Sequence, residues 1–394
     1  MPKHTIGLYL FLTLVKGLGI SFISATYVMF LISRGLNLFE ISLVNFVFFT
    51  TLFFCEIPTG AIADNIGRKA SFVISCFLLS VSMFIYAVMH SFWGFAFAEV
   101  VAAVGITFSS GAFQAWLVDK LKSENYKGSL GAVFAKEQQI TNLAGIIGAF
   151  CGAYLADKNI LFPWIAGGLS LLLAGFLAMV FMREEYFVPQ KLSFKEGIST
   201  MKKTALLSFQ YSRKNKAFKF IALMGFFHYF AIQAPNMQWQ PFFSQFLSSK
   251  TSLGAIFGAI SVSLILGSAF SSSFLRILGS ERNALIVSQV IVGAGVFATV
   301  LFACFPFALG IFLVHEFARG LFRPIKDLYL NENIPSKERA TLISFESMFR
   351  HIGGMKGLLF CGFVAEYVSI SAAWMFSGGV LLVSALYLMK NGRH

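Results

Sequence analysis

The sequence predicts an all-α integral membrane protein with twelve transmembrane helices in two six-helix, pseudo-symmetric halves. Hydrophobic residues make up 57% of the 394 positions and charged residues 12%, about half of the ~25% that is usual in a soluble domain. Apolar segments of about 20 residues, the length that spans a bilayer, recur along the chain, and one polar stretch divides them into two groups. This composition excludes a cytosolic enzyme and a disordered chain.

The apolar segments fill almost the whole chain and leave no room for a sizeable soluble domain. The first group is expected at 6–33, 39–62, 70–90, 92–119, 128–156 and 160–182. The second group is expected at 217–247, 251–275, 282–304, 306–328, 338–367 and 370–389. The predicted domains are therefore an N-terminal half at 1–182, a cytoplasmic basic linker at 183–216 and a C-terminal half at 217–394.

The net charge of +13 is explained by membrane topology, because Lys and Arg collect in cytoplasmic loops. The linker has an excess of basic over acidic residues, with Lys191, Lys195, Lys202, Lys203, Arg213, Lys214 and Lys216 against Glu184, Glu185 and Glu196. Alternation of the spans from this linker places both termini in the cytoplasm. We expect a multi-pass protein of a bacterial inner membrane, in contact with lipid and not with nucleic acid.

An internal repeat relates the two halves at an offset of 209 residues. The positions Glu137, Gly145, Gly148 and Asp157 fall on Glu346, Gly354, Gly357 and Glu366. Each set lies on the fifth span of its half and the turn after it. Two six-span halves of this kind are an organisation of secondary transporters, with the binding site at the bilayer midplane.

No metal or organic cofactor is expected. The five cysteines lie in apolar runs without a C-x-x-C spacing, and the sequence has no H-E-x-x-H motif. It also lacks the G-x-x-x-x-G-K-[ST] loop of ATP-driven proteins. We expect a monomer that is not an enzyme and that draws its energy from the proton gradient.

A glycine-rich basic loop connects the second and third predicted spans. Its residues Gly60, Asp64, Gly67, Arg68 and Lys69 match the pattern G-x-x-x-D-[RK]-x-G-R-[RK], in which Asn65 replaces the first basic residue. In this position the loop resembles the signature loop of the major facilitator superfamily, and the resemblance covers the whole chain. It implies a transporter that works by alternating access, the two halves rocking about a central site.

The resemblance also implies that this loop is an inner gate. Asp64 is expected to meet the positive N-terminal end of another helix, with Ser336 as a candidate N-cap, and Arg68 to bind Asp64 or nearby carbonyls. Gly60 and Gly67 would permit close helix packing and a tight turn. The alternative is that Arg68 and its basic neighbour only fix the topology.

Two further motifs of the superfamily are imperfect. In the fourth span, Glu99 stands where proton-coupled exporters often carry Arg in R-x-x-x-G-x-G. In the fifth span, G-P-x-x-G becomes Gly148-Ala149-Phe150-Cys151-Gly152, without the proline. Both departures weaken an assignment to drug–proton antiporters and leave import open.

Charged residues deep in the first and fourth spans are functional candidates, because a charge at the bilayer centre costs at least about 2.5–3.5 kcal/mol. Lys16 is interpreted either as a substrate-cavity cation or as an ion-pair partner of Glu99 or another acid. Glu99 is interpreted as a proton-coupling carboxyl, and its alternatives are a pairing with Lys16 or a place near the outer surface.

The tenth and eleventh spans carry further candidates. His315, Glu316 and Arg319 lie close together on the tenth span, Glu316 and Arg319 on one helix face. His315 and Glu316 are proton-coupling candidates, and Arg319 is a substrate-cavity candidate. Lys356, set among glycines of the eleventh span, is another cavity candidate. A purely structural network is the alternative.

Other buried charges are interpreted as structural ion pairs. Glu346 and Arg350 are four residues apart on one helix and can pair. Glu137, their counterpart by the repeat, lies beside Lys136 and is interpreted in the same way. Glu56 is interpreted as a structural partner of the inner gate.

The seventh span is rich in uncharged polar side chains near a proline. His228, Gln233 and Asn236 lie on either side of Pro235. Hydrogen-bonding groups next to a helix-kinking proline suit a gate or a polar ligand, so these residues are predicted to line the substrate cavity. Interhelical hydrogen bonding is the alternative.

These observations predict a proton-coupled secondary transporter of a small solute, with export of a drug-like or amphipathic, anionic metabolite favoured. An importer or uniporter of a small organic anion is the first alternative. A receptor or scaffold that uses the same fold without transport is the second.

Overall fold

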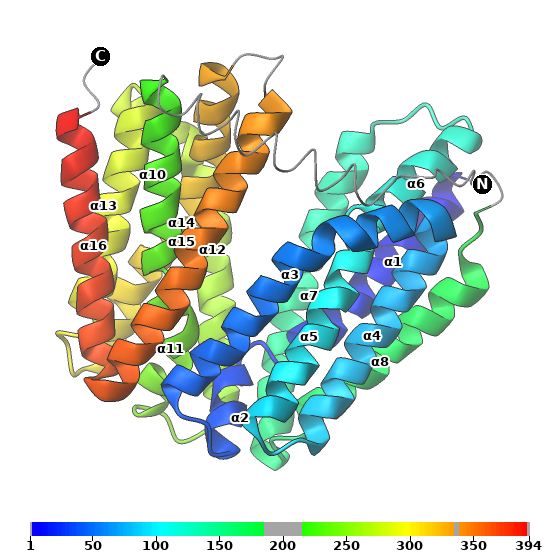
Figure 1. Ribbon diagram of the computed structural model, residues 1–394, viewed down its shortest axis with the longest axis horizontal. Coiled ribbons are helices and arrows are strands. Elements are labelled where there is room, and N and C mark those ends of the chain that lie inside the picture. Colours follow the sequence, from blue (N-terminus) through cyan, green and yellow to red (C-terminus); the bar gives the residue numbers. More distant parts are fainter. Residues whose placement is uncertain (1, 185–214, 335–338, 392–394) are drawn as a thin grey trace. The chain divides into compact units, whose positions relative to one another are not determined.

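The computed structural model describes residues 2–184, 215–334 and 339–391, and this part of the chain is helical without strands (Figure 1). Eleven of its helical segments are long and apolar enough to cross a membrane. The remaining predicted span, 338–367, is the 29-residue helix α15, Arg339–Tyr367, which has the length of a span but is not among these eleven. The linker between 185 and 214 lies outside the described residues.

The chain forms two compact units, whose boundaries run through two of the helices. The first unit comprises 1–36, 47–198 and 247–258, and the second comprises 37–46, 199–246 and 259–394. The start of the second predicted span therefore packs with the C-terminal part of the chain. The start of the eighth predicted span packs with the N-terminal part.

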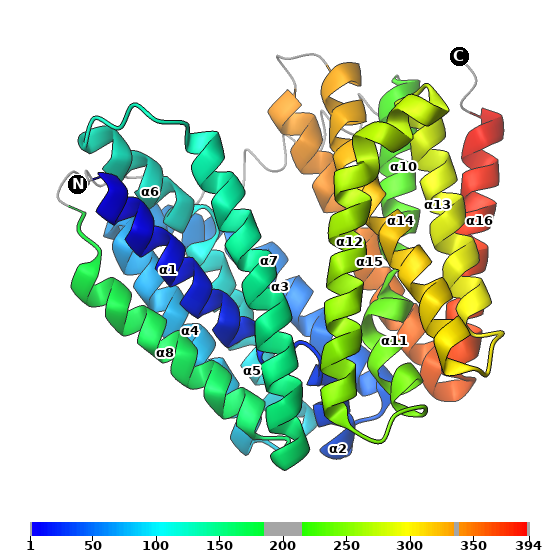
Figure 2. The same ribbon diagram turned by 180° about the vertical axis from the view of Figure 1, so that it is seen from behind.

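The first unit is a helical bundle around an aromatic core. Its helices are α1 (Pro2–Ser21), α2 (Tyr27–Ser33), α3 (Leu38–Ile66, from residue 47), α4 (Arg68–Val88), α5 (Phe92–Ser109), α6 (Ala112–Ser123), α7 (Leu130–Lys158) and α8 (Phe162–Phe181). Helix α1 packs along α7 and α8, and α4 packs along α8 and α5 (Figure 2). Tyr9, Phe72, Phe113 and Trp116 form the centre of one buried cluster.

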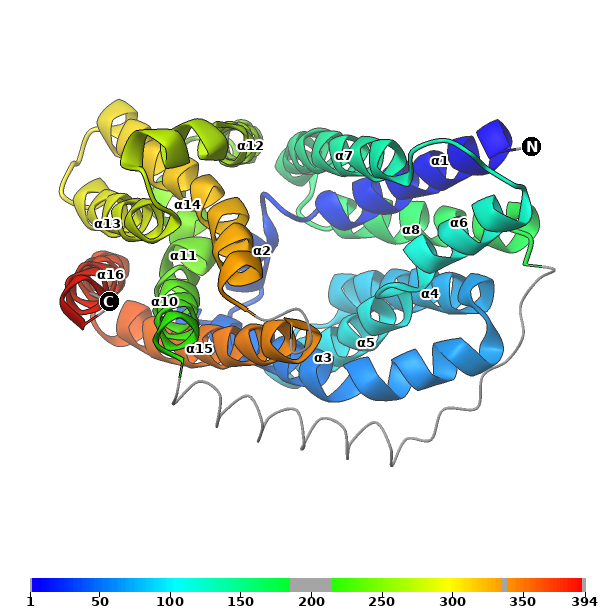
Figure 3. The same ribbon diagram turned by 90° about the horizontal axis from the view of Figure 1, so that it is seen from above.

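The second unit has the corresponding elements. Its helices are α10 (Lys216–Ala231), α11 (Gln233–Ser244), α12 (Lys250–Leu278, from residue 259), α13 (Glu281–Thr299), α14 (Phe305–Asn333), α15 and α16 (Ile370–Asn391). Helix α10 packs along α15, and α13 packs along α14 and α16 (Figure 3). Phe218, Leu285, Leu321 and Phe345 belong to its main buried cluster.

Three predicted spans are interrupted and not continuous. The first is broken at 22–26, the fourth at Gly111, which has a φ of +72°, and the seventh at Ile232. Pro235 explains the break at Ile232, because its ring displaces the preceding turn and it has no N–H to donate. The breaks at 22–26 and at Ile232 occupy equivalent positions when the two halves are aligned at the repeat offset of 209 residues. The first span of each half is therefore broken at the same place.

Glycines bring the first and fifth spans of each half into close contact. A Cβ on Gly148 of α7 would lie 2.7 Å from Ser21 Cβ at the end of α1, and one on Gly152 would lie 1.7 Å from the carbonyl oxygen of Phe22, the residue after α1. Gly145, expected to act in the same way, faces no atom within 4 Å. In the second unit, Gly353 and Gly357 of α15 meet the backbone of α10 at Phe226 and Phe230 in the same manner.

The paired acids of the repeat, Asp157 and Glu366, both cap the start of a helix. In the first unit, the Asp157 carboxylate accepts hydrogen bonds from Ser249 Oγ at 2.6 Å, from the backbone N–H of Lys250 at 2.6 Å and from Thr251 N–H at 2.8 Å. In the second unit, Glu366 Oε2 accepts from the backbone N–H of Leu38 at 2.9 Å. Each carboxylate also lies at the positive end of a helix dipole.

Loss of the Asp157 cap is expected to destabilise the protein. Asp157→Ala should lower the free energy of unfolding by about 1 kcal/mol, the usual effect of removing a helix cap, and Glu366→Ala by less because it accepts one bond. Thermal unfolding of the purified protein in detergent measures the effect. Glu332→Ala, at an exposed acid near the end of α14, is the matched control, and an equal loss there would contradict the capping role.

Candidate functional site

A buried ion pair on α14 is the centre of a polar cluster in the second unit. Glu316 Oε1 lies 2.9 Å from Arg319 Nη1, and the two side chains are 2% and 18% exposed. The same Nη1 donates to Asn236 Oδ1 of α11 at 2.9 Å. The break between α10 and α11 therefore leaves an amide oxygen next to a charged face of α14.

Two histidines border this pair and leave hydrogen-bonding capacity unused. His315 Nδ1 lies 2.9 Å from the Val292 carbonyl oxygen, which only accepts, so Nδ1 donates and Nε2 of the neutral ring is an acceptor. His315 Nε2, Glu316 Oε2 and His228 Nδ1 are buried without a hydrogen-bond partner among the described residues. The His228 ring is stacked 3.8 Å from Phe322. A proton or a polar solute would satisfy these atoms.

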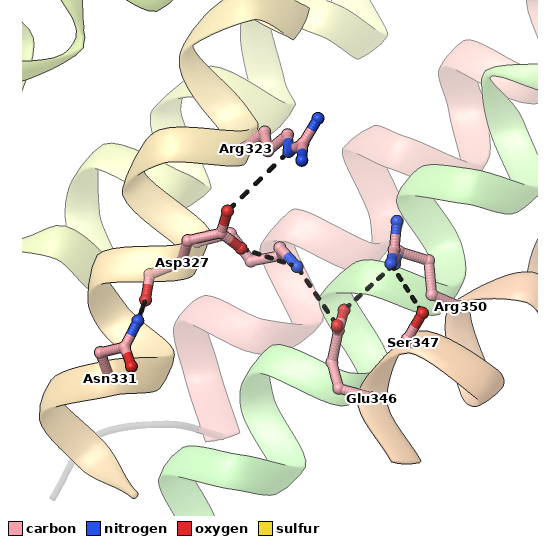
Figure 4. Close-up of polar contacts among 7 residues, drawn as sticks. Arg323, Asp327, Asn331, Glu346, Ser347 and Arg350 are labelled. Atoms are coloured by element: carbon pink, nitrogen blue, oxygen red, sulfur yellow. Dashed lines mark hydrogen bonds and ion pairs between the residues drawn. The ribbon is translucent and has the colours of Figure 1, made fainter. Parts of the chain in front are cut away.

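A second ionic network joins α14 to α15 (Figure 4). Glu346 Oε2 lies 3.2 Å from Lys326 Nζ, and Glu346 Oε1 lies 3.5 Å from Arg350 Nε. Lys326 also pairs with Asp327 at 3.1 Å, and the Arg350 guanidinium lies over the Tyr229 ring at 4.4 Å. The predicted pair of Glu346 and Arg350 is confirmed, and Lys326 completes it from the neighbouring helix.

Glu99 occupies a different environment in the first unit. Its Oε1 accepts hydrogen bonds from Tyr27 Oη at 2.7 Å and from Tyr86 Oη at 2.5 Å. The alternative pairing with Lys16 is not formed, because the Lys16 ammonium lies over the Phe72 ring at 5.1 Å. Two tyrosine hydroxyls supply the hydrogen bonds to Glu99 that this alternative assigned to a cation.

The signature loop has a fixed arrangement inside the first unit. Gly67 has a φ of +98°, which confirms the expected tight turn, but a Cβ on Gly60 would meet nothing within 4 Å. Arg68 pairs with Asp119 at 3.1 Å. The side chain of Asp64, its expected partner, lies outside the described residues, as Ser336 does. The contact with Asp119 holds the loop against α6.

A carboxylate from the edge of the linker caps the helix that follows the loop. Glu184 accepts from the backbone N–H of Arg68 at 2.8 Å and from that of Lys69 at 2.9 Å. Arg68 is therefore held in two ways: its side chain pairs with Asp119, and its backbone N–H donates to Glu184.

The remaining candidates do not join these clusters. Gln233 Nε2 of α11 donates to the Tyr229 carbonyl of α10 at 3.2 Å, across the break between the two helices, and Lys356 is exposed. Among the described residues, neither Glu56 nor Glu137 forms the expected ion pair. Glu56 is exposed, and Glu137 accepts instead from the Gln114 amide at 3.2 Å.

The sequence interpretation missed Tyr27, Tyr86, Lys326 and Asp119. Lys326 lies on the same span as Glu316 and Arg319 but was not among the candidates. Tyr27 and Tyr86 lie in apolar runs, and each carries a hydroxyl that seeks a partner when it is buried. Tyrosines in apolar spans are therefore candidate hydrogen-bond partners for buried acids, and the sequence alone provides this signal.

Comparison with known proteins agrees with this architecture. Residues 9–247 and 221–393 match the family model described as the Major Facilitator Superfamily. An uncharacterized MFS-type transporter, YxaM of Bacillus subtilis, is 24% identical over 385 residues, which are 94% of this chain and 91% of that protein. The quinolone resistance protein NorA of Staphylococcus aureus is 22% identical over 408 residues, 100% of this chain and 98% of the relative.

Solved structures show the same fold at low sequence identity. The nucleoside transporter NupG matches with a TM-score of 0.77 and 14% identity, covering 98% of both chains. The human organic anion transporter MFSD10 matches with a TM-score of 0.63 and 15% identity, covering 98% of this chain and 99% of the other. The chain belongs to the Major Facilitator Superfamily and is a membrane transporter, not an enzyme.

Proposed function

We propose that this protein is a proton-coupled secondary transporter that exports a small amphipathic solute by alternating access. The main support for this proposal is the buried cluster of Glu316, Arg319 and Asn236, next to which acceptor atoms lie without a hydrogen-bond partner among the described residues. Buried polar atoms without partners are costly in any protein, and a transport site must leave such groups free for its solute. Twelve spans, cytoplasmic termini, an inner-membrane location and a monomer belong to the same proposal.

The cluster suits a solute that carries both a hydrogen-bond donor and an acidic group. Arg319 donates, whereas His315 Nε2 and Glu316 Oε2 accept. Relatives named for multidrug and quinolone resistance support export. A quinolone carries a carboxylate and an amine and therefore suits both parts of the cluster.

Reconstituted liposomes with a trapped pH dye test this proposal. Norfloxacin, ethidium and p-aminohippurate would be added one at a time, without an imposed gradient. We expect norfloxacin to change the lumenal pH in vesicles that contain the protein and not in empty vesicles. Glu316→Gln/Arg319→Gln, which removes both charges, should abolish the response, and Glu332→Gln should retain it.

The alternatives predict other outcomes. Movement of labelled solute without a pH change would identify a uniporter or a different coupling ion. A pH change of the opposite sign, with the protein orientation in the vesicles determined, would indicate import. The absence of flux for all three probes would oppose the proposal and favour a receptor or scaffold.

A further inference from the structure

Glu99 is a buried acid whose hydrogen-bond partners are all neutral. It is 7% exposed, and both tyrosine hydroxyls donate to the same oxygen, Oε1. The two hydroxyl oxygens are 3.2 Å apart. Tyr27 is the first residue of α2 and Tyr86 lies in the last turn of α4, so two helices converge on one carboxyl group of α5.

The surrounding rings fix the position of both hydroxyls. Tyr86 is stacked on Trp164 with ring centroids 4.2 Å apart and on Phe95 at 5.3 Å. Tyr27 packs against Trp164 at 6.1 Å. Packed aromatic rings leave little freedom for either phenol, so the donors remain aimed at Oε1 whether Glu99 is ionised or protonated.

No cation neutralises Glu99 within ion-pair distance among the described residues. The titratable groups that face it are Tyr27 from α2 and Tyr86 from α4, while α8 contributes the Trp164 ring. The nearest cations by sequence have other contacts: Lys16 lies over Phe72, and Arg34, at the end of α2, binds the Ala87 carbonyl and His90.

The buried acids of the second unit differ in this respect. Glu316 is paired with Arg319 at 2.9 Å, and Glu346 lies between Lys326 and Arg350. Protonation of either acid would leave a largely buried cation without its partner, and breaking a buried pair costs about 3–5 kcal/mol. Protonation of Glu99 removes a buried charge and leaves no cation behind.

We propose that Glu99 carries the coupling proton, that Tyr27 and Tyr86 position it, and that the solute binds separately at the Glu316 and Arg319 cluster. The step is an acid–base equilibrium: a proton from water forms an O–H bond on the Glu99 carboxylate and returns to water on release. Both tyrosines continue to donate to Oε1 while Oε2 takes the proton. This assignment rests on the proposed proton-coupled transport and identifies its proton site.

Infrared difference spectroscopy of the reconstituted protein tests the assignment without any solute. A step from about pH 8 to about pH 6 stays above the range in which exposed carboxylates take up protons, so the carbonyl stretch of a protonated carboxylic acid that it produces should come from a buried acid. That band should be absent in Glu99→Gln and present in Glu316→Gln. Its persistence in Glu99→Gln, or its loss only in Glu316→Gln, would overturn the assignment.

Transport assays separate proton coupling from solute movement. Glu99→Gln keeps a side-chain oxygen for both tyrosines and should retain norfloxacin exchange at equal pH, while losing at least tenfold in proton-driven accumulation. Glu99→Asp should recover part of the accumulation. Full accumulation in Glu99→Gln would refute the proton site, whereas the absence of norfloxacin movement in wild type would count against the proposed function even if the infrared band is present.

Tyr86→Phe and Tyr27→Phe test the positioning role. Each removes one hydroxyl that stabilises the ionised carboxylate, so proton-driven accumulation should show its optimum at higher pH, with the larger shift in the double variant. Tyr329→Phe, which changes a buried tyrosine on α14 in the second unit, is the control and should leave the pH profile unchanged. An unchanged profile in the double variant would contradict a positioning role.

Discussion

Arg319→Gln is expected to abolish norfloxacin transport and to destabilise the second unit by about 3–5 kcal/mol. The Glu316 carboxylate, 2% exposed, would lose its charged partner and keep two unsatisfied acceptors nearby. Asn236 would at the same time lose the donor to its Oδ1. Norfloxacin exchange in liposomes and thermal unfolding in detergent measure the two effects on the same preparation.

The double variant Glu316→Gln/Arg319→Gln separates stability from function. Two neutral amides avoid an unpaired buried charge, so most of the lost stability should return while transport remains absent. Comparison of both single variants with the double variant gives the coupling energy of the pair directly. If Arg319→Gln is as stable as wild type, water must solvate the Glu316 carboxylate. The cluster would then be more accessible to water than the 2% exposure of Glu316 indicates.

The sequence predicted the fold well because bilayer-spanning helices leave a strong periodic signal. The length of the apolar segments, the basic residues in the loops and the repeat at 209 residues can all be read from the sequence without knowledge of contacts in space. The breaks at 22–26 and Ile232 were not foreseen, because 6–33 contains no proline and an apolar run has the same composition whether its helix is continuous or broken. The proline near Ile232 was noted, but a kink was expected instead of two helices.

The site was predicted less completely, because partners in space come from distant parts of the chain. The i,i+3 and i,i+4 spacings correctly placed Glu316 beside Arg319 and Glu346 beside Arg350. Spacing on one helix says nothing of Lys326, twenty residues before Glu346. The alternative that paired Lys16 with Glu99 rested on charge alone, whereas helix packing brings two tyrosines to that acid.

Gly152→Ala is expected to prevent tight packing of α7 on α1 and to destabilise the first unit by about 3 kcal/mol or more, at the upper end of overpacking effects. The added methyl group would overlap the Phe22 carbonyl oxygen and neighbouring backbone atoms. A backbone at a helix break cannot move aside as a flexible side chain does, so the helices must separate. The yield of monodisperse protein and its thermal unfolding midpoint measure the loss.

Gly145→Ala on the same helix is the matched control and should have the opposite sign. No atom lies within 4 Å of the new methyl group, and alanine is favoured over glycine within a helix by about 0.5–1 kcal/mol. Gly357→Ala and Gly379→Ala form the same comparison in the second unit, where Gly357 meets the Phe230 backbone and Gly379 faces open space. Equal behaviour of Gly152→Ala and Gly145→Ala would show that α1 and α7 are not in contact through glycine. A strong effect at Gly152 without one at Gly357 would limit this packing to the first unit.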